Sequence, residues 1–154
     1  MKITHPLCKM ISASFCALLL PLACLAADTA SIVVNVSGLN SDEGVARIAL
    51  FNDKEKYSKD KGSAAEAFQK EAVPIKDKAA SHTFSNVPYG DYAIKVYHDE
   101  DNSGTFYTGA FGMPKVQYGF SNNAKGAFGP ASFEKAKFSV QVKEVTQNIQ
   151  VSGK

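Results

Sequence analysis

Apolar and polar residues alternate along several short stretches of the chain. A period of two is typical of β-strands that bury one face. The stretches predicted as strands on this basis are 31–36, 45–51, 72–76, 81–87, 136–142 and 145–151. Because residues that favour turns separate them, the sequence predicts an all-β fold, an antiparallel β-sandwich of about seven strands.

The most regular pattern lies within residues 84–104, between a tight turn and an acidic loop. Pro88 fixes φ and Gly90 permits a positive φ, as a tight turn requires. In the strand that follows, side chains alternate between two faces. One face carries Tyr92, Ile94, Val96 and His98, and the other carries Ala93, Lys95 and Tyr97.

Two pairs of predicted strands are expected to form hairpins. The link at 37–44 is rich in turn formers and joins the strands at 31–36 and 45–51. The strands at 136–142 and 145–151 are predicted to form the last hairpin.

One or two short helical turns are predicted between the second and third strands. Asn52 or Asp53 can cap a helix over residues 54–57. Ser63 and Glu66 have the spacing of a capping box. Mixed charges in this part of the chain favour a solvated surface segment.

A long connection at 109–130 is rich in glycine and contains four aromatic residues. A loop of this length in a compact domain is either functional or disordered. Its aromatic residues need burial, which argues against disorder. We therefore expect an ordered loop packed against the sandwich through Phe111, Tyr118, Phe120 and Phe128.

The N-terminus has the features of a secretory signal peptide. A short apolar run follows basic residues and precedes small residues, which predicts a signal at 1–26 and a single domain at 27–154. Its product would be periplasmic or secreted, without a transmembrane span. Lipidation at Cys24 is the alternative, although Pro21 stands where such signals favour leucine.

Removing this signal changes the charge and the cysteine content. Lys2 and Lys9 leave with it, so 17 basic residues become 15 and balance the 15 acidic ones. A net charge of zero gives no reason to expect nucleic acid as a partner. All three cysteines lie within the signal, so the mature chain has no disulfide.

Five segments resemble the DUF2141 family of bacterial exported proteins. They are 84–93, 97–104, 112–115, 118–124 and 129–136. The turn between the strands near Pro88 is also similar to transthyretin-like and carboxypeptidase-regulatory-like modules. The resemblance implies a seven-stranded β-sandwich of the transthyretin or immunoglobulin type, in the periplasm or at the surface. It implies no reaction.

The acidic loop is a candidate site for Ca²⁺. Oxygen ligands at alternate positions before Gly104 resemble the first half of an EF-hand loop. The predicted ligands are Asp99, Asp101, Ser103 and the carbonyl of Thr105. Because Tyr107 and Ala110 stand at the ninth and twelfth positions, any such site is weak, and a turn without an ion is the alternative.

A second candidate site combines a histidine with the loop that follows residue 117. The candidate ligand-binding residues are His98, Tyr118, Phe120, Ser121, Asn122 and Asn123. Asp99 cannot orient His98 in a catalytic triad, because adjacent residues of a strand point to opposite faces. A buried structural histidine is the alternative role for His98. With only His82 and His98 in the mature chain, a transition-metal site lacks donors.

These observations predict an exported, non-catalytic binding or interaction module of the cell envelope. The aromatic and amide groups at 118–123 suit a peptide, a glycan or an envelope protein as partner. One alternative is an enzyme centred on His98 with Ser121 or Asn122. The other is a structural accessory of an envelope complex.

Overall fold

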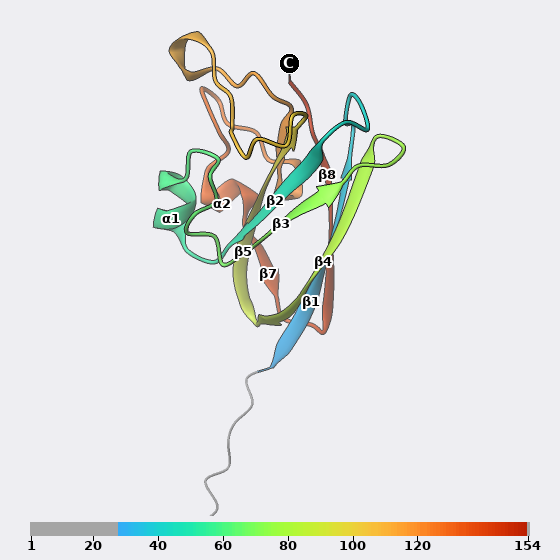
Figure 1. Ribbon diagram of the computed structural model, residues 1–154. Coiled ribbons are helices and arrows are strands. Elements are labelled where there is room, and N and C mark those ends of the chain that lie inside the picture. The colour runs from blue at the N-terminus through green and yellow to red at the C-terminus, as the bar shows by residue number, and fades with distance from the viewer. Residues whose placement is uncertain (1–27, 154) are drawn as a thin grey trace, which may run out of the picture.

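Two β-sheets pack against each other in the computed structural model, which describes residues 28–153 (Figure 1). The predicted signal peptide and Cys24 lie outside this range. The strands are β1 Thr29–Ser37, β2 Val45–Phe51, β3 Gln69–Pro74, β4 Ala79–Pro88, β5 Gly90–Asp99, β6 Tyr118–Phe120, β7 Phe138–Val140 and β8 Glu144–Gln150. The helices are α1 Lys54–Lys59 and α2 Phe133–Ala136, and 3₁₀ turns occur at Ala110–Gly112 and Ser121–Asn123.

The topology confirms the predicted all-β sandwich and changes its details. One sheet has the order β4-β1-β8, and the other has the order β3-β2-β5-β6, with β7 also paired to β5. Neighbouring strands are antiparallel except β1 and β8, which run parallel. The structure has eight strands rather than seven, because β6 forms inside the predicted long loop.

Neither predicted hairpin forms. β1 belongs to the three-stranded sheet and β2 to the five-stranded sheet, and β7 and β8 are divided in the same way. Periodicity identifies a strand and its buried face, but it does not identify the partner strand. Both links therefore cross between the sheets.

The main core lies between the two sheets. Tyr92, Ile94 and Val96 point into it from β5, as the alternation predicts. They meet residues such as Ile32 and Val34 of β1. Because full burial of one such side chain contributes about 1.5–3 kcal/mol, this core is the main source of stability.

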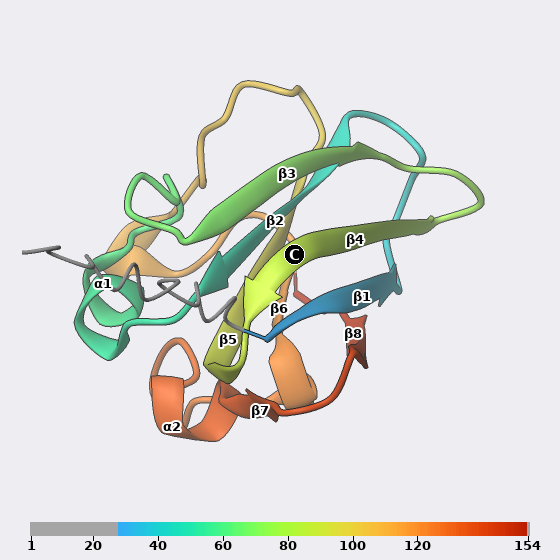
Figure 2. The same cartoon turned by 90° about the horizontal axis from the view of Figure 1, so that it is seen from below.

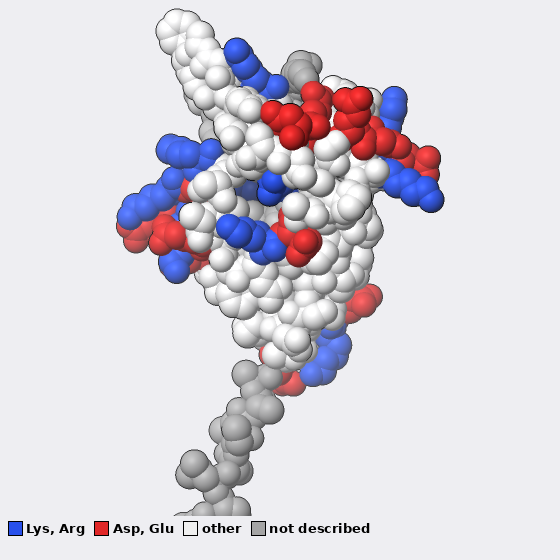
Figure 3. Space-filling view, viewed as in Figure 1, with Lys and Arg blue, Asp and Glu red and all other residues white. Residues whose placement is uncertain are grey.

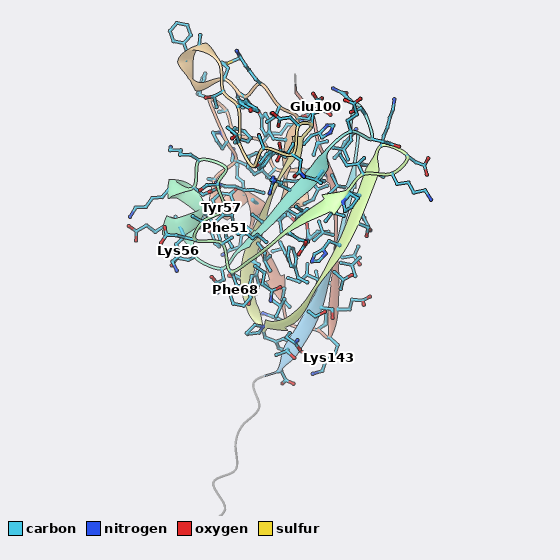
Figure 4. All side chains as sticks on the ribbon, in the orientation of Figure 1. Phe51, Lys56, Tyr57, Phe68, Glu100 and Lys143 are labelled. Atoms are coloured by element: carbon cyan, nitrogen blue, oxygen red, sulfur yellow. The ribbon has the colours of Figure 1, made fainter. Side chains whose placement is uncertain are left out.

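A second, smaller core covers part of the outer face of the five-stranded sheet. Phe51 and Tyr57 lie close together beside α1 (Figure 4), with ring centroids 5.6 Å apart. The ring of Phe133 from α2 is also 5.6 Å from Tyr57. In Figure 2 both helices lie on the left and β1, β4 and β8 on the right. Part of the five-stranded sheet is thus buried on both faces.

The helices agree with only one of the two expected caps. The side chain of Asp53 accepts a hydrogen bond of 2.8 Å from the backbone N–H of Lys56 and caps α1, as predicted. The second expected turn is wrong, because no helix forms at Ser63 and Glu66. Ser63 instead accepts from the N–H of Ala65 at 3.4 Å. Neither α1 nor α2 has the length and apolar character that a membrane span needs.

Candidate ligand-binding groove

Two rows of side chains cross the outer face of the five-stranded sheet. Residues paired across antiparallel strands point to the same face, so strand register alone defines these rows. The first row is Lys70, Ala49, Lys95 and Phe120, and the second is Ala72, Arg47, Tyr97 and Tyr118. Four strands, β3, β2, β5 and β6, therefore contribute one side chain each to both rows.

All eight of these residues line a groove with a volume of about 1230 Å³. Its walls come from the segments 58–64, 104–114 and 126–132. Ala49 and Ala72 keep the floor low, because their side chains end at Cβ. Figure 3 shows a hollow on this face, with both basic and acidic side chains beside it.

Tyr97 is the most unusual residue of the floor. Its side chain is only 6% exposed, yet its hydroxyl has no hydrogen-bond partner. No other buried side-chain nitrogen or oxygen within residues 28–153 lacks one. Burial raises the pKa of Tyr97 to about 12, so its hydroxyl keeps its proton at neutral pH. The groove thus contains a buried donor that no protein group uses.

Phe106 forms a partial roof above Tyr97. The two rings meet edge to face with centroids 5.3 Å apart. Gly62, from another wall, approaches so closely that a Cβ there would lie 2.2 Å from the Cβ of Phe106. Gly62 also has φ of +105°, which disfavours other residues. Contact between these two walls narrows access to the tyrosine.

Lys95 connects the floor of the groove to the wall at 58–64. Its ammonium donates to the carbonyls of Tyr57 and Asp60, at 2.7 and 3.0 Å, and to the Asp60 carboxylate at 3.2 Å. The same Nζ lies 4.5 Å from the centre of the Tyr57 ring. Burial lowers the pKa of Lys95, and Asp60 opposes this effect. Lys95 is thus already fully bonded to protein groups.

Arg47 and Asp99 fix the start of the wall at 104–114. Arg47 Nε donates to the Asp99 carboxylate, which is 1% exposed. The same carboxylate accepts from the backbone N–H groups of Gly104 at 2.8 Å and Ser103 at 3.1 Å. Arg47 Nη2 also donates to Asn102 at 3.0 Å. Asp99 therefore positions the loop that leaves β5.

Residues 34–148 match the sequence profile of a family described as "Uncharacterized protein conserved in bacteria (DUF2141)". The chain belongs to the DUF2141 family. Every residue that lines the groove of this DUF2141 protein lies inside the matched region. No curated protein and no solved structure matches the chain.

The candidate Ca²⁺ ligands of the DUF2141 protein make hydrogen bonds within their own loop and to Arg47. Asp101 accepts from the hydroxyl of Tyr107 at 3.0 Å and from Ser103 N–H at 3.3 Å. The hydroxyl of Ser103 accepts from the N–H of Thr105 at 3.2 Å. Within residues 28–153, no group of three His, Cys, Asp or Glu side chains is arranged to hold a metal ion.

Millimolar Ca²⁺ is expected to leave the melting temperature unchanged. The cation would have to displace Arg47 and two backbone donors from Asp99. A site with a Kd of about 10⁻⁴–10⁻³ M would add about 1.4 kcal/mol at tenfold excess of the ion. Thermal unfolding with and without Ca²⁺ measures this. A rise in Tm that disappears in Asp101→Asn would identify Asp99 and Asp101 as ligands.

His98 points away from the groove and is buried. Its Nε2 donates to the Glu43 carbonyl at 2.8 Å, and its Nδ1 lies 3.4 Å from Gln117 Oε1. A separate cavity of about 160 Å³ is lined by His98 together with Asp99, Glu100, Asp101, Tyr107, Lys115 and Val116. Ser121 and Asn122 do not line it. The structure thus does not bring the three residues of the enzyme alternative together.

The polar residues of the predicted ligand loop bind backbone groups. Ser121 Oγ accepts from Ile94 N–H at 2.9 Å and donates to the carbonyl of Ala136 at 2.5 Å. Asn122 donates to the carbonyl of Lys137 at 2.8 Å. Asn123 Oδ1 accepts from the N–H of Gln150 at 2.8 Å. These side chains hold α2 and β8 in place, whereas Tyr118 and Phe120 of the same prediction line the groove.

The apolar tips of the long connection are exposed, contrary to the sequence-based expectation. Tyr118 and Phe120 pack against the sheet, but Phe111 and Phe128 are 103% and 105% exposed. A glycine follows each of them, and a Cβ added at Gly112 or Gly129 would meet no atom within 4 Å, so both segments stand in open space. Phe111, Phe128 and the exposed Met113 instead form the apolar rim of the groove.

Sequence reasoning missed Arg47, Lys95, Tyr97 and Phe106 as groove residues. Lys95 and Tyr97 were placed correctly on the second face of β5. However, a strand face that carries Ala93 beside Lys95 and Tyr97 looks like an ordinary solvent-exposed face. The pattern therefore did not indicate that other segments cover it. Repeated aromatic residues at 97, 106, 118 and 120 were the available signal, because aromatic side chains rarely cluster on a face that only water covers.

Proposed function

We propose that this DUF2141 protein is an exported, non-catalytic binding module of the cell envelope, and that its ligand binds in the groove above Tyr97. The unpartnered hydroxyl of Tyr97 carries this proposal. A buried polar group without a partner costs about 1–3 kcal/mol. A ligand acceptor that reaches this covered hydroxyl past the ring of Phe106 would remove that cost on binding.

The shape and lining of the groove support the same role. Binding sites in proteins are concave and mostly apolar, with a few polar groups that fix orientation. Aromatic rings of Tyr97, Phe106 and Tyr118 supply a surface for stacking, and their centroids lie 5.3 Å and 6.4 Å apart in succession. The volume of about 1230 Å³ suits a sizeable small molecule or a short segment of peptide or glycan. The signal at 1–26 supports export.

The bonding of Ser121 and His98 favours a binding role over the enzyme alternative. Ser121 is fully buried, and its hydroxyl already has both a donor and an acceptor partner. A nucleophile needs a free, accessible oxygen next to a base. A structural accessory remains the second candidate, because the exposed Phe111 and Phe128 favour contact with another envelope component.

Nile Red, a neutral aromatic dye with a carbonyl acceptor, tests binding in the groove. We expect its fluorescence to rise with the wild type, and its affinity to fall about tenfold in Tyr97→Phe, since one hydrogen bond and the relief of a buried hydroxyl are lost. The same variant without dye should be more stable by about 1 kcal/mol. Tyr107→Phe is the matched control, because Tyr107 lies outside the groove.

A variant that fills the groove distinguishes binding at this site from binding to other apolar surfaces. Ala72→Trp places a large ring on the floor, and Ala65→Trp adds the same ring at an exposed position outside the groove. Only Ala72→Trp should abolish binding. Equal affinity in the wild type, Tyr97→Phe and Ala72→Trp would show that the dye binds elsewhere and would overturn the proposal.

A further inference from the structure

The charged residues around the groove carry a surplus of positive charge. Those lining it are Arg47, Lys61, Lys70, Lys95, Asp60 and Glu71. Arg47 is neutralised by Asp99 beneath it, and Lys95 is neutralised by Asp60. Two of the four cations are therefore already balanced by buried carboxylates.

Lys61 and Lys70 are the two cations that remain. Both are exposed, and within the described chain neither forms an ion pair. Glu71 follows Lys70 in β3 and also lines the groove, but within the described chain it forms no ion pair with either lysine. Once Glu71 is counted against one of these two lysines, the groove still has an excess of one positive charge, although the mature chain has no net charge.

We infer that the ligand of the groove is an amphipathic anion, with an aromatic or apolar body over Tyr97 and Tyr118 and an anionic group beside Lys61 and Lys70. This inference rests on the proposed binding function and names the chemistry of its ligand. Complementary charge is the reason, because an anion gains attraction from both lysines without displacing an existing partner.

The spacing of the rows sets the size of this ligand. Lys70 and Tyr97 lie two strands apart and in adjacent rows. Strand spacing of about 4.8 Å and a rise of about 3.3 Å per residue put their backbone positions about 12 Å apart. The flexible lysine side chain shortens this gap. A body of two or three rings therefore spans from Tyr97 to Lys70, whereas a small anion alone reaches only one of them.

Two dyes with the same aromatic body test the charge. N-phenyl-1-naphthylamine is neutral, and 1-anilinonaphthalene-8-sulfonate adds one sulfonate to it. The wild type should bind the sulfonate about fivefold to tenfold more tightly, as expected for two partly exposed ion pairs. Higher salt should reduce this preference, because screening weakens exposed charges.

Variants of the lysines test whether Lys61 and Lys70 cause the preference for the sulfonate dye. Lys61→Gln/Lys70→Gln should bind both dyes equally, and Lys76→Gln/Lys78→Gln, which removes two exposed lysines outside the groove, should behave as the wild type. Equal affinity for the two dyes in the wild type would overturn the inference but leave the binding function intact. Failure of both dyes to bind, or unchanged binding in Ala72→Trp, would overturn the binding function as well.

Discussion

Replacing Asp99 with alanine should lower the free energy of unfolding by about 3–5 kcal/mol, because breaking a buried ion pair leaves an unpaired charge in the protein. Asp99 is 1% exposed and holds Arg47 and two backbone N–H groups. All three donors lose their acceptor together in the variant. Urea unfolding followed by circular dichroism measures the change.

Asp101→Ala is the matched control in the same loop. Its carboxylate is exposed, and hydrogen bonds from Ser103 and Tyr107 lower its pKa. Water can replace those bonds, so its loss should change stability far less than the loss of Asp99. A loss in Asp99→Ala as small as that in Asp101→Ala would show that solvent reaches Asp99 and that the pair with Arg47 is not a buried one.

Asp99→Ala should also weaken ligand binding in the groove. Asp99 fixes Ser103 and Gly104, where the wall at 104–114 begins. Phe106 follows in this wall and covers Tyr97. Loss of the anchor should therefore lower Nile Red affinity under conditions where Asp99→Ala is still folded.

The sequence predicted most of the strands because one face of each is buried. Alternation placed Tyr92, Ile94 and Val96 correctly in the core of β5, and Asp53 was recognised as the cap of α1. Which strands pair with each other was not predictable in the same way. β1 pairs with β8 across more than a hundred residues, and no local pattern records such a contact. The predicted hairpins failed for this reason.

The candidate site was harder to predict, because its residues come from four strands. Strand register brings Arg47, Tyr97 and Tyr118 side by side, and register is a property of the folded sheet. Sequence reasoning instead favoured polar loop residues such as Asn122, whose amide binds backbone carbonyls. The basic partner of the acidic loop, Arg47, was missed for a similar reason, since it lies on a neighbouring strand.

Replacing Lys95 with methionine should also lower the free energy of unfolding by about 3–5 kcal/mol. Its ammonium is the donor for the last carbonyls of α1 and for the Asp60 carboxylate, which is only 5% exposed. Methionine keeps the contact with the aromatic rings of Phe51 and Tyr57. The loss therefore reports the charge rather than the packing. Urea unfolding at neutral pH measures it.

The double variant Lys95→Met/Asp60→Asn should recover much of this loss. Burial lowers the pKa of Lys95 even with Asp60 beside it, so desolvation of the ammonium outweighs the attraction of the pair. A neutral pair removes that cost, and asparagine can still accept the N–H of Ala64, which Asp60 now binds at 2.8 Å. A double-mutant cycle should give a coupling of about 2–3 kcal/mol between the two sites. Additive losses would show that Lys95 and Asp60 act independently, and that Lys95 holds the wall of the groove through the backbone carbonyls of α1 alone.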